Sequence, residues 1–221
     1  MPNWNKYLAN YQLRHGGHFF GAREDECDSH LVLTEGEPSP ILVWVDTDPA
    51  GRYSERNLKA RTMVRLNKEY NLHIWARSLV GTGVKGVLNL VKGEGDYGYP
   101  EATRGRAITT SNEAFTKLVL GDLELRNALI AREKEYLKVR SAPQGDGWHV
   151  VEVGYDSFEG TMTGSSPWMD RLITNAQELG YMEPQDRAVI EQAAQDYFDG
   201  QMDEFLIFLR AARRAVTTWR L

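Results

Sequence analysis

The clearest structural signal in the sequence lies in residues 58–77, which read LKARTMVRLNKEYNLHIWAR. Over residues 58–66 apolar or small side chains stand at every second position, and most of the intervening positions are basic. The same alternation returns over residues 72–77, after a polar connection. Since successive side chains of a β-strand point to opposite faces, a repeat of two predicts a strand in each run. We expect the two strands to pair as an antiparallel hairpin, with one face toward the core and the other toward water.

The water-facing side of this hairpin gathers basic and aromatic side chains, namely Arg61, Arg65, His73, Trp75 and Arg77. Guanidinium groups beside an indole can hold an anionic or aromatic ligand, and basic residues interleaved with aromatic ones suit single-stranded nucleic acid. The simpler interpretation is a solvated sheet face on which long cationic side chains cover aromatic surface. We treat these residues as the candidate face for a ligand or partner.

The rest of the chain predicts further strands joined by short helices. Residues 3–13 have the spacing of an amphipathic helix. Two β-rich runs, 30–34 and 41–45, flank a turn rich in glycine and proline, and 136–140 and 148–153 flank another, so each pair predicts a hairpin. Residues 107–110 predict a strand, and Ser111 or Asn112 can cap the helix that follows, with a second short helix after it. The expected fold is therefore α+β, with a mostly antiparallel sheet.

The C-terminal quarter predicts helices. Residues 160–166 resemble a linker, and a first helix over 167–180 follows it. Pro184 is expected to open a second helix and Gly200 to end it before a third, with short connections that favour antiparallel neighbours. We therefore expect an α+β sheet body over residues 1–160 and a helical segment over 161–221 packed on it, together forming one compact unit.

Composition restricts the classes of function. The chain has 221 residues, is 42% hydrophobic and carries a formal net charge of −5, so it is a poor general binder of nucleic acid. A single cysteine, Cys27, excludes an intrachain disulfide and fits a reducing compartment. The N-terminus lacks the pattern of a secretory signal, and no apolar run approaches the length of a membrane span. We expect a soluble cytoplasmic protein with no membrane partner.

A divalent metal site is the main catalytic candidate. Asp46 and Asp48 follow the apolar run 41–45, and two carboxylates at the end of a strand can bind Mg²⁺ or Mn²⁺. With a phosphorylated or nucleotide substrate, such a site would support metal-dependent transfer chemistry. The same residues precede Pro49 and Gly51 and also suit a turn.

Two weaker patterns suggest ligands. His15, His18, Cys27 and His30 form the region richest in histidine and cysteine, but they lack the paired spacing of a structural zinc site. Gly81, Gly83 and Gly86 match the spacing of a dinucleotide-binding loop, but no long helix can follow before the next glycines. A glycine-rich connection over residues 81–98, able to act as a ligand lid, is the alternative.

These observations favour a non-catalytic binding or interaction protein, with a protein partner or a second copy of the chain as its ligand. One alternative is an enzyme that uses Asp46 and Asp48 with Mg²⁺ or Mn²⁺ on a phosphorylated or nucleotide substrate. Another is a weak single-stranded nucleic-acid binder that uses the 58–77 hairpin face.

Overall fold

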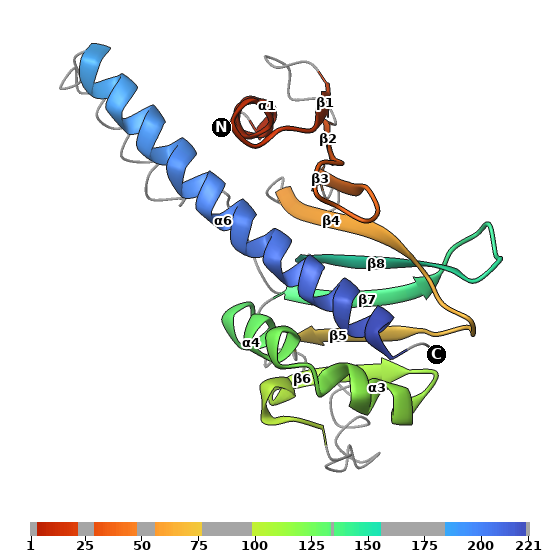
Figure 1. Cartoon of the computed structure of the whole chain (residues 1–221). Helices are drawn as coiled ribbons and strands as arrows, with labels where there is room; N and C mark the ends of the chain where they lie inside the picture. The colour runs from red at the N-terminus through yellow and green to blue at the C-terminus, as the bar shows by residue number, and fades with distance from the viewer. Residues whose placement is uncertain are drawn as a thin grey trace. The chain divides into compact units, whose positions relative to one another are not determined.

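The computed structural model describes residues 4–21, 29–47, 56–76, 99–133, 135–155 and 184–219. Its architecture is α+β, as predicted: an antiparallel sheet carries short helices and a long C-terminal helix (Figure 1). In chain order the elements are α1 (Trp4–His15), β1 (His18–Phe20), β2 (His30–Leu33), β3 (Ile41–Thr47), β4 (Arg56–Arg65), β5 (Leu72–Ala76), the 3-10 helix η1 (Glu101–Thr103), β6 (Arg106–Thr110), α3 (Glu113–Leu120), α4 (Leu123–Ala131), β7 (Glu135–Ser141), β8 (Trp148–Tyr155) and α6 (Pro184–Thr218).

The sheet has eight strands in the order β1-β2-β3-β4-β8-β7-β5-β6. The predicted hairpins β2–β3 and β7–β8 are confirmed, as are both strands within residues 58–77. The hairpin expected between those two strands is wrong, because β4 pairs with β3, and β5 pairs with β6 and β7. Alternation along a strand reports which face is buried and carries no information about which strand lies beside it.

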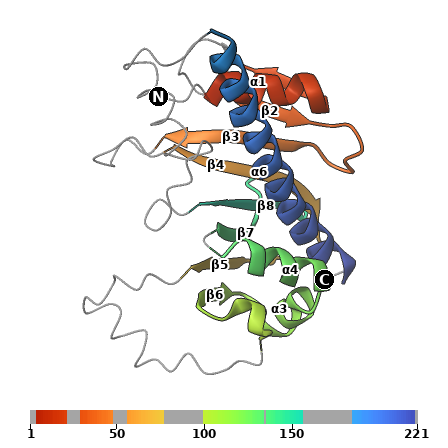
Figure 2. The ribbon, with the colours of Figure 1, turned by 90° about the vertical axis from the view of Figure 1, so that its left-hand side faces the viewer.

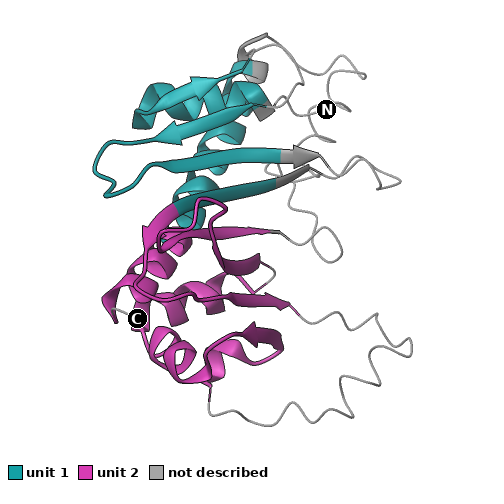
Figure 3. Cartoon of the chain, turned by 90° about the vertical axis from the view of Figure 1, so that its right-hand side faces the viewer, with its two compact units in different colours: residues 1–62, 161–207 teal, residues 63–160, 208–221 magenta. Residues whose placement is uncertain are grey.

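The chain divides into two compact units (Figure 3). Unit 1 comprises residues 1–62 and 161–207, and unit 2 comprises residues 63–160 and 208–221. The division runs through β4 and through α6, so each unit contains part of both elements. The predicted boundary at residue 160, between a sheet body and a helical segment, stays a prediction.

Unit 1 buries one face of its strands against α1 and the first part of α6 (Figure 2). Leu31, Val43 and Ala60 are register partners on neighbouring strands, and each is fully buried. From the helices, Leu8, Phe198 and Phe205 are buried to the same degree. The apolar side of α1 that the amphipathic spacing predicted is therefore part of the core of unit 1.

Unit 2 repeats this arrangement with α3, α4 and the last part of α6. Ile74, Leu137 and Val153 are register partners on β5, β7 and β8, and all are fully buried. Asn112 caps α3 as expected, since its Oδ1 accepts the Phe115 N–H at 3.0 Å. Asp122 caps α4 in the same way by accepting the Leu125 N–H at 2.9 Å.

The predicted stop at Gly200 is wrong, because α6 is one helix of 35 residues that passes through this glycine. A glycine in a helix interior costs about 1 kcal/mol relative to alanine. Burying Phe198 and Met202 on either side of it contributes about 1.5–3 kcal/mol each, which outweighs that cost. The helix predicted over 167–180 lies outside the described residues. Within the described part of the chain, no helix has the length and apolar character needed to cross a membrane.

Arg106 ties three elements of unit 2 together. Its guanidinium donates to the carbonyl oxygens of Leu129 and Arg132, at the end of α4, and of Glu135, at the start of β7. Burial lowers the pKa of Arg106, and the charge of Glu135 opposes that shift. A cation at a helix C-terminus satisfies carbonyl groups that have no partner within the helix. Arg106 therefore fixes where α4 ends and β7 begins.

The turn between β7 and β8 is anchored by a second buried group, His149. Its Nε2 accepts the Tyr70 N–H at 3.0 Å, and its Nδ1 donates to the Gly147 carbonyl at 2.9 Å. The same carbonyl accepts the Leu66 N–H at 2.8 Å. Two hydrogen bonds, from Leu66 and from Tyr70, therefore hold the connection between β4 and β5 against the β7–β8 turn, and the bond from His149 to Gly147 fixes the histidine within that turn.

We expect Gly147→Ala to destabilise the protein by more than about 2 kcal/mol in urea denaturation followed by tryptophan fluorescence. Gly147 has φ +77°, and a Cβ there would lie 2.4 Å from the Leu66 carbonyl oxygen. The substitution therefore adds a backbone clash to the cost of a left-handed conformation.

Gly145→Ala is the matched control. Gly145 has φ +71°, but a Cβ there meets no atom within 4 Å. Its expected cost is about 1 kcal/mol, for the backbone conformation alone. Equal costs for the two variants would contradict the close approach of Gly147 to Leu66.

Candidate functional site

The structure divides the residues that were predicted to share one basic aromatic face. Arg61 belongs to unit 1, where its guanidinium carbon lies 5.1 Å from the ring centroid of Trp44. Arg65 is exposed at the end of β4, which does not pair with β5. Arg77 lies outside the described residues. The expected pairing of an arginine with an indole therefore occurs, but with Trp44 on the neighbouring β3 and not with Trp75.

His73 and Trp75 instead join an aromatic residue of β7. The rings of His73 and Trp75 are 4.4 Å apart between centroids, and His73 meets Tyr136 edge-on at 6.1 Å. His73 pairs directly with Lys138, so Lys138 lies on the same side of the sheet, and Arg140 follows it two residues along the strand. We call His73, Trp75, Tyr136, Lys138 and Arg140 the aromatic face of unit 2.

One carboxylate lies among these groups. Glu152 of β8 is the register partner of Lys138, and its Oε1 accepts the Tyr136 hydroxyl at 2.7 Å. Arg140 Nη2 lies 3.8 Å from Glu152 Oε2. The aromatic face therefore carries two basic side chains and one acidic side chain, and the hydrogen bond to Glu152 fixes the position of the Tyr136 hydroxyl.

This arrangement is suited to binding. His73 and Trp75 are half-buried, and Arg140 is exposed with 45% of its side chain accessible. Rings held in a fixed register offer a planar contact at little cost in conformational entropy, and nearby cations attract carboxylates or phosphates. The aromatic face therefore offers rings to planar groups and basic side chains to acidic groups.

The metal prediction for Asp46 and Asp48 remains untested. Asp46 lies in β3 opposite Asn57, and Asp48 lies outside the described residues. Among the described residues, no group of three or more His, Cys, Asp or Glu side chains is arranged to hold a metal ion. Whether Asp46 and Asp48 bind Mg²⁺ or Mn²⁺ stays a prediction.

The histidines of the second metal pattern lie on separate elements. His15 ends α1 and stacks on Tyr11 at 4.1 Å, whereas His18 lies in β1 and His30 in β2. His18 and His30 are at opposite ends of the β1–β2 pairing. Cys27 and the glycine-rich segment 81–98 lie outside the described residues.

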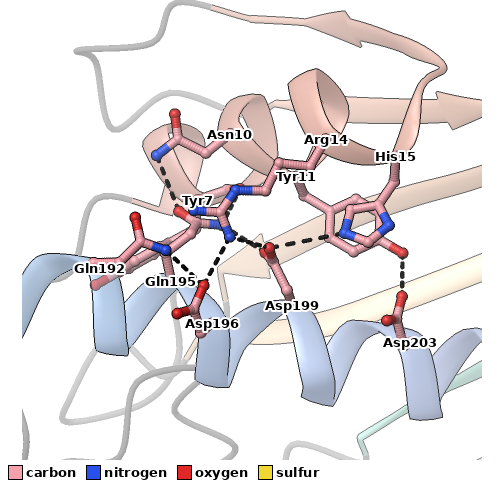
Figure 4. A network of polar contacts seen from close by, with 10 residues as sticks. All are labelled: Tyr7, Asn10, Tyr11, Arg14, His15, Gln192, Gln195, Asp196, Asp199 and Asp203. Carbon is pink, nitrogen blue, oxygen red and sulfur yellow. Dashed lines mark hydrogen bonds and ion pairs between the residues drawn. The ribbon is translucent and has the colours of Figure 1, made fainter.

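A network of polar side chains joins α1 to α6 in unit 1 (Figure 4). Asp199 lies at its centre, where its Oδ2 accepts from Arg14 at 2.6 Å and its Oδ1 accepts from Gln195 at 2.7 Å. His15 Nε2 lies 3.8 Å from the same carboxylate. Tyr11 donates its hydroxyl to Asp203 at 2.6 Å, one helical turn further along. The network holds α1 on α6 in one register.

Hydrogen bonds to Asp196 and Asp199 raise the pKa of Arg14, and the charges of these carboxylates act in the same direction. The Arg14 guanidinium therefore stays cationic beside the largely buried Asp199. Asp196 bonds the same Arg14 nitrogen from a more exposed position, at 2.9 Å. We assign this network a structural role.

The sequence alone did not predict this network, although the spacing of its residues is visible there. Gln192, Asp196, Asp199 and Asp203 recur at intervals of three or four along α6, which places them on one helix face. On α1, Tyr7, Tyr11 and Arg14 do the same. The pattern on α6 alone resembles an exposed polar face, and the tyrosines of α1 lie on the side predicted to be apolar, so only the packing of α1 on α6 reveals that the two sets are partners.

We expect Asp199→Asn to destabilise the protein by about 1–3 kcal/mol in urea denaturation, because Arg14 then loses its closest and least exposed anionic partner. Asp196→Asn removes a carboxylate that is 60% exposed and should cost less than about 1 kcal/mol. If Asp196→Asn lowers the free energy of unfolding as much as Asp199→Asn does, burial of Asp199 is not the reason why the Arg14–Asp199 pair stabilises the fold.

Tyr70 is a titratable group in the core of unit 2. Its ring is fully buried and meets Phe115 edge-on at 4.7 Å. Its hydroxyl lies 2.7 Å from Thr116 Oγ1, which also bonds Thr110. Burial raises the pKa of Tyr70 to about 12, although the threonine hydrogen bonds pull it downward.

This shift predicts a loss of stability in alkali. The phenol of the unfolded chain ionises with its ordinary pKa of 10.0, whereas burial raises the pKa of folded Tyr70 to about 12. The stabilisation is therefore complete below pH 10 and disappears as the pH rises to about 12, a change of about 3 kcal/mol in the free energy of unfolding. Tyr70→Phe should flatten this alkaline decline in urea titrations at successive pH values. The exposed Tyr197→Phe is the control, and an identical slope in both variants would contradict the prediction.

Comparisons of this chain with protein-family models, with curated protein sequences and with solved structures found no match.

Proposed function

We propose that this chain is a non-catalytic binding protein whose ligand surface is the aromatic face of unit 2. The observation that carries the proposal is the arrangement of His73, Trp75 and Tyr136, with ring centroids 4.4 Å and 6.1 Å apart, beside Lys138 and Arg140. Core side chains alternate with these residues on the same strands, and Tyr136 is itself buried, so the accessible part of the face is formed by His73, Trp75, Lys138 and Arg140.

The partner that fits best is a protein segment that carries carboxylates and aromatic rings. Such a segment offers rings to Trp75 and His73 and charges to Lys138 and Arg140. Nucleic acid fits less well, because the chain has a formal net charge of −5 and Glu152 lies among the cations. The hairpin face on which the nucleic-acid hypothesis rested is not formed, since β4 and β5 do not pair.

The test measures fluorescence anisotropy of a labelled copolymer of glutamate and tyrosine, titrated with the whole protein at low salt. We expect the wild type to bind, and Trp75→Ala to weaken binding about tenfold through the loss of ring contact. Lys138→Gln should weaken binding by a similar factor and reduce its dependence on salt.

Arg61→Gln is the matched control. It removes a cation that lies over an indole, but in unit 1, so the affinity should not change. Thermal melts of every variant confirm that the fold is intact. Absence of binding by the wild type, or equal weakening by Arg61→Gln and Trp75→Ala, overturns the proposal. Tighter binding to labelled oligothymidine than to the copolymer also overturns it and favours the nucleic-acid alternative.

A further inference from the structure

The outer edge of β6 directs hydrogen-bonding groups away from the sheet. Among the described strands, β6 is the last in the sheet order, and it pairs with β5 on one side. Ser111 donates its N–H to the Asn71 carbonyl at 3.0 Å, immediately beyond the paired residues. In an antiparallel ladder, hydrogen-bonded pairs alternate with non-bonded pairs. The backbone N–H and carbonyl groups of Thr109 and Ala107 therefore also point toward β5. Ile108 therefore directs its N–H and carbonyl outward, at the centre of the edge.

This edge carries few of the features that usually prevent pairing. Edge strands are commonly shortened, charged, or interrupted by proline. β1, at the other end of the sheet order, has only three residues. β6 has five, and after Arg106 they are Ala107, Ile108, Thr109 and Thr110, with no charge and no proline. Three of these four residues are β-branched and favour extended structure.

Helix α3 lies beside β6 in unit 2 and is fastened to it (Figures 1 and 2). The Oγ1 atoms of Thr110 and Thr116 are 2.7 Å apart, and Asn112 caps the helix directly after the strand. The exposed side of α3 presents Glu113, Ala114, Lys117 and Leu118. Leu118 is 46% exposed, so α3 leaves a large apolar side chain in water.

We propose that two copies of this chain form a dimer through antiparallel pairing of β6 with β6, in which α3 of each copy packs against α3 of the other. A two-fold axis at Ile108 lets each copy donate the Ile108 N–H to the Ile108 carbonyl of the other. The same axis makes the two α3 helices antiparallel neighbours.

The charges of α3 complement each other in this arrangement. Glu113 and Lys117 are one helical turn apart, so two antiparallel copies can place Glu113 of one copy beside Lys117 of the other, twice in each dimer. Ala114 and Leu118 lie one residue further along, so the small side chain of one copy can receive the large side chain of the other. A second copy thus satisfies both the backbone edge and the outer side of the helix.

The first test measures the mass of the whole protein by light scattering across a range of concentrations. We expect a dimer for the wild type and a monomer for Ile108→Pro, because proline removes the outward N–H without breaking a bond to β5. Ile108→Ala loses the same side-chain packing but keeps the N–H, so it should remain dimeric.

The second test exchanges the charges of α3. Glu113→Lys alone and Lys117→Glu alone should each weaken the dimer about tenfold by creating like-charge pairs, and the double variant should restore it. The charge variants test the proposed dimer even if Ile108→Pro fails to fold. A monomeric wild type at all concentrations, a dimer that persists in a folded Ile108→Pro variant, or single charge variants that leave the mass unchanged overturns the proposal.

Discussion

The register of β5 against its two neighbours determines which side chains share a surface in unit 2. Ile74 pairs with Ile108 on one side and with Leu137 on the other. A shift of one residue in either pairing would move every side chain of a strand to the opposite face. With this register, Trp75 joins the face that carries Lys138, and the backbone of Ile108 points outward from the edge. The core, the aromatic face and the β6 edge are three consequences of one hydrogen-bond pattern.

Local patterns in the sequence sufficed to predict most elements, and what they could not predict was pairing between distant segments. The polar run between β4 and β5 resembles a hairpin turn, yet it contains Tyr70, whose ring is fully buried. Tyr70 donates its N–H to His149, 79 positions along the chain. No local pattern encodes that bond. It anchors this connection to the β7–β8 turn, which separates two strands that would otherwise be expected to pair.

The same limit explains the candidate site. His73 and Trp75 were predicted to share a face, and they do, because two residues on one strand are related by local geometry alone. Their cationic neighbours, Lys138 and Arg140, come from β7 and depend on the pairing of β5 with β7. Arg61 and Arg65 were placed beside them only because the sequence brings them close along the chain. Glycine in α6 is a related case: Gly200 has a low helix propensity, but packing of its neighbours prevails.

Charged groups inside the two units have a different role from those on the aromatic face. Arg106 donates to carbonyl groups of α4 and β7, so its removal leaves buried carbonyls without that partner, whereas Asp199 accepts from Arg14 of α1 and from Gln195 of its own helix. Lys138 and Arg140 lie opposite the core face and face solvent at least in part. The fold can therefore tolerate change at these cations while it depends on the buried charges. Substitutions of Lys138 and Arg140 are consequently expected to leave the core of unit 2 unchanged, because strand alternation places these side chains and the core on opposite sides of the same sheet.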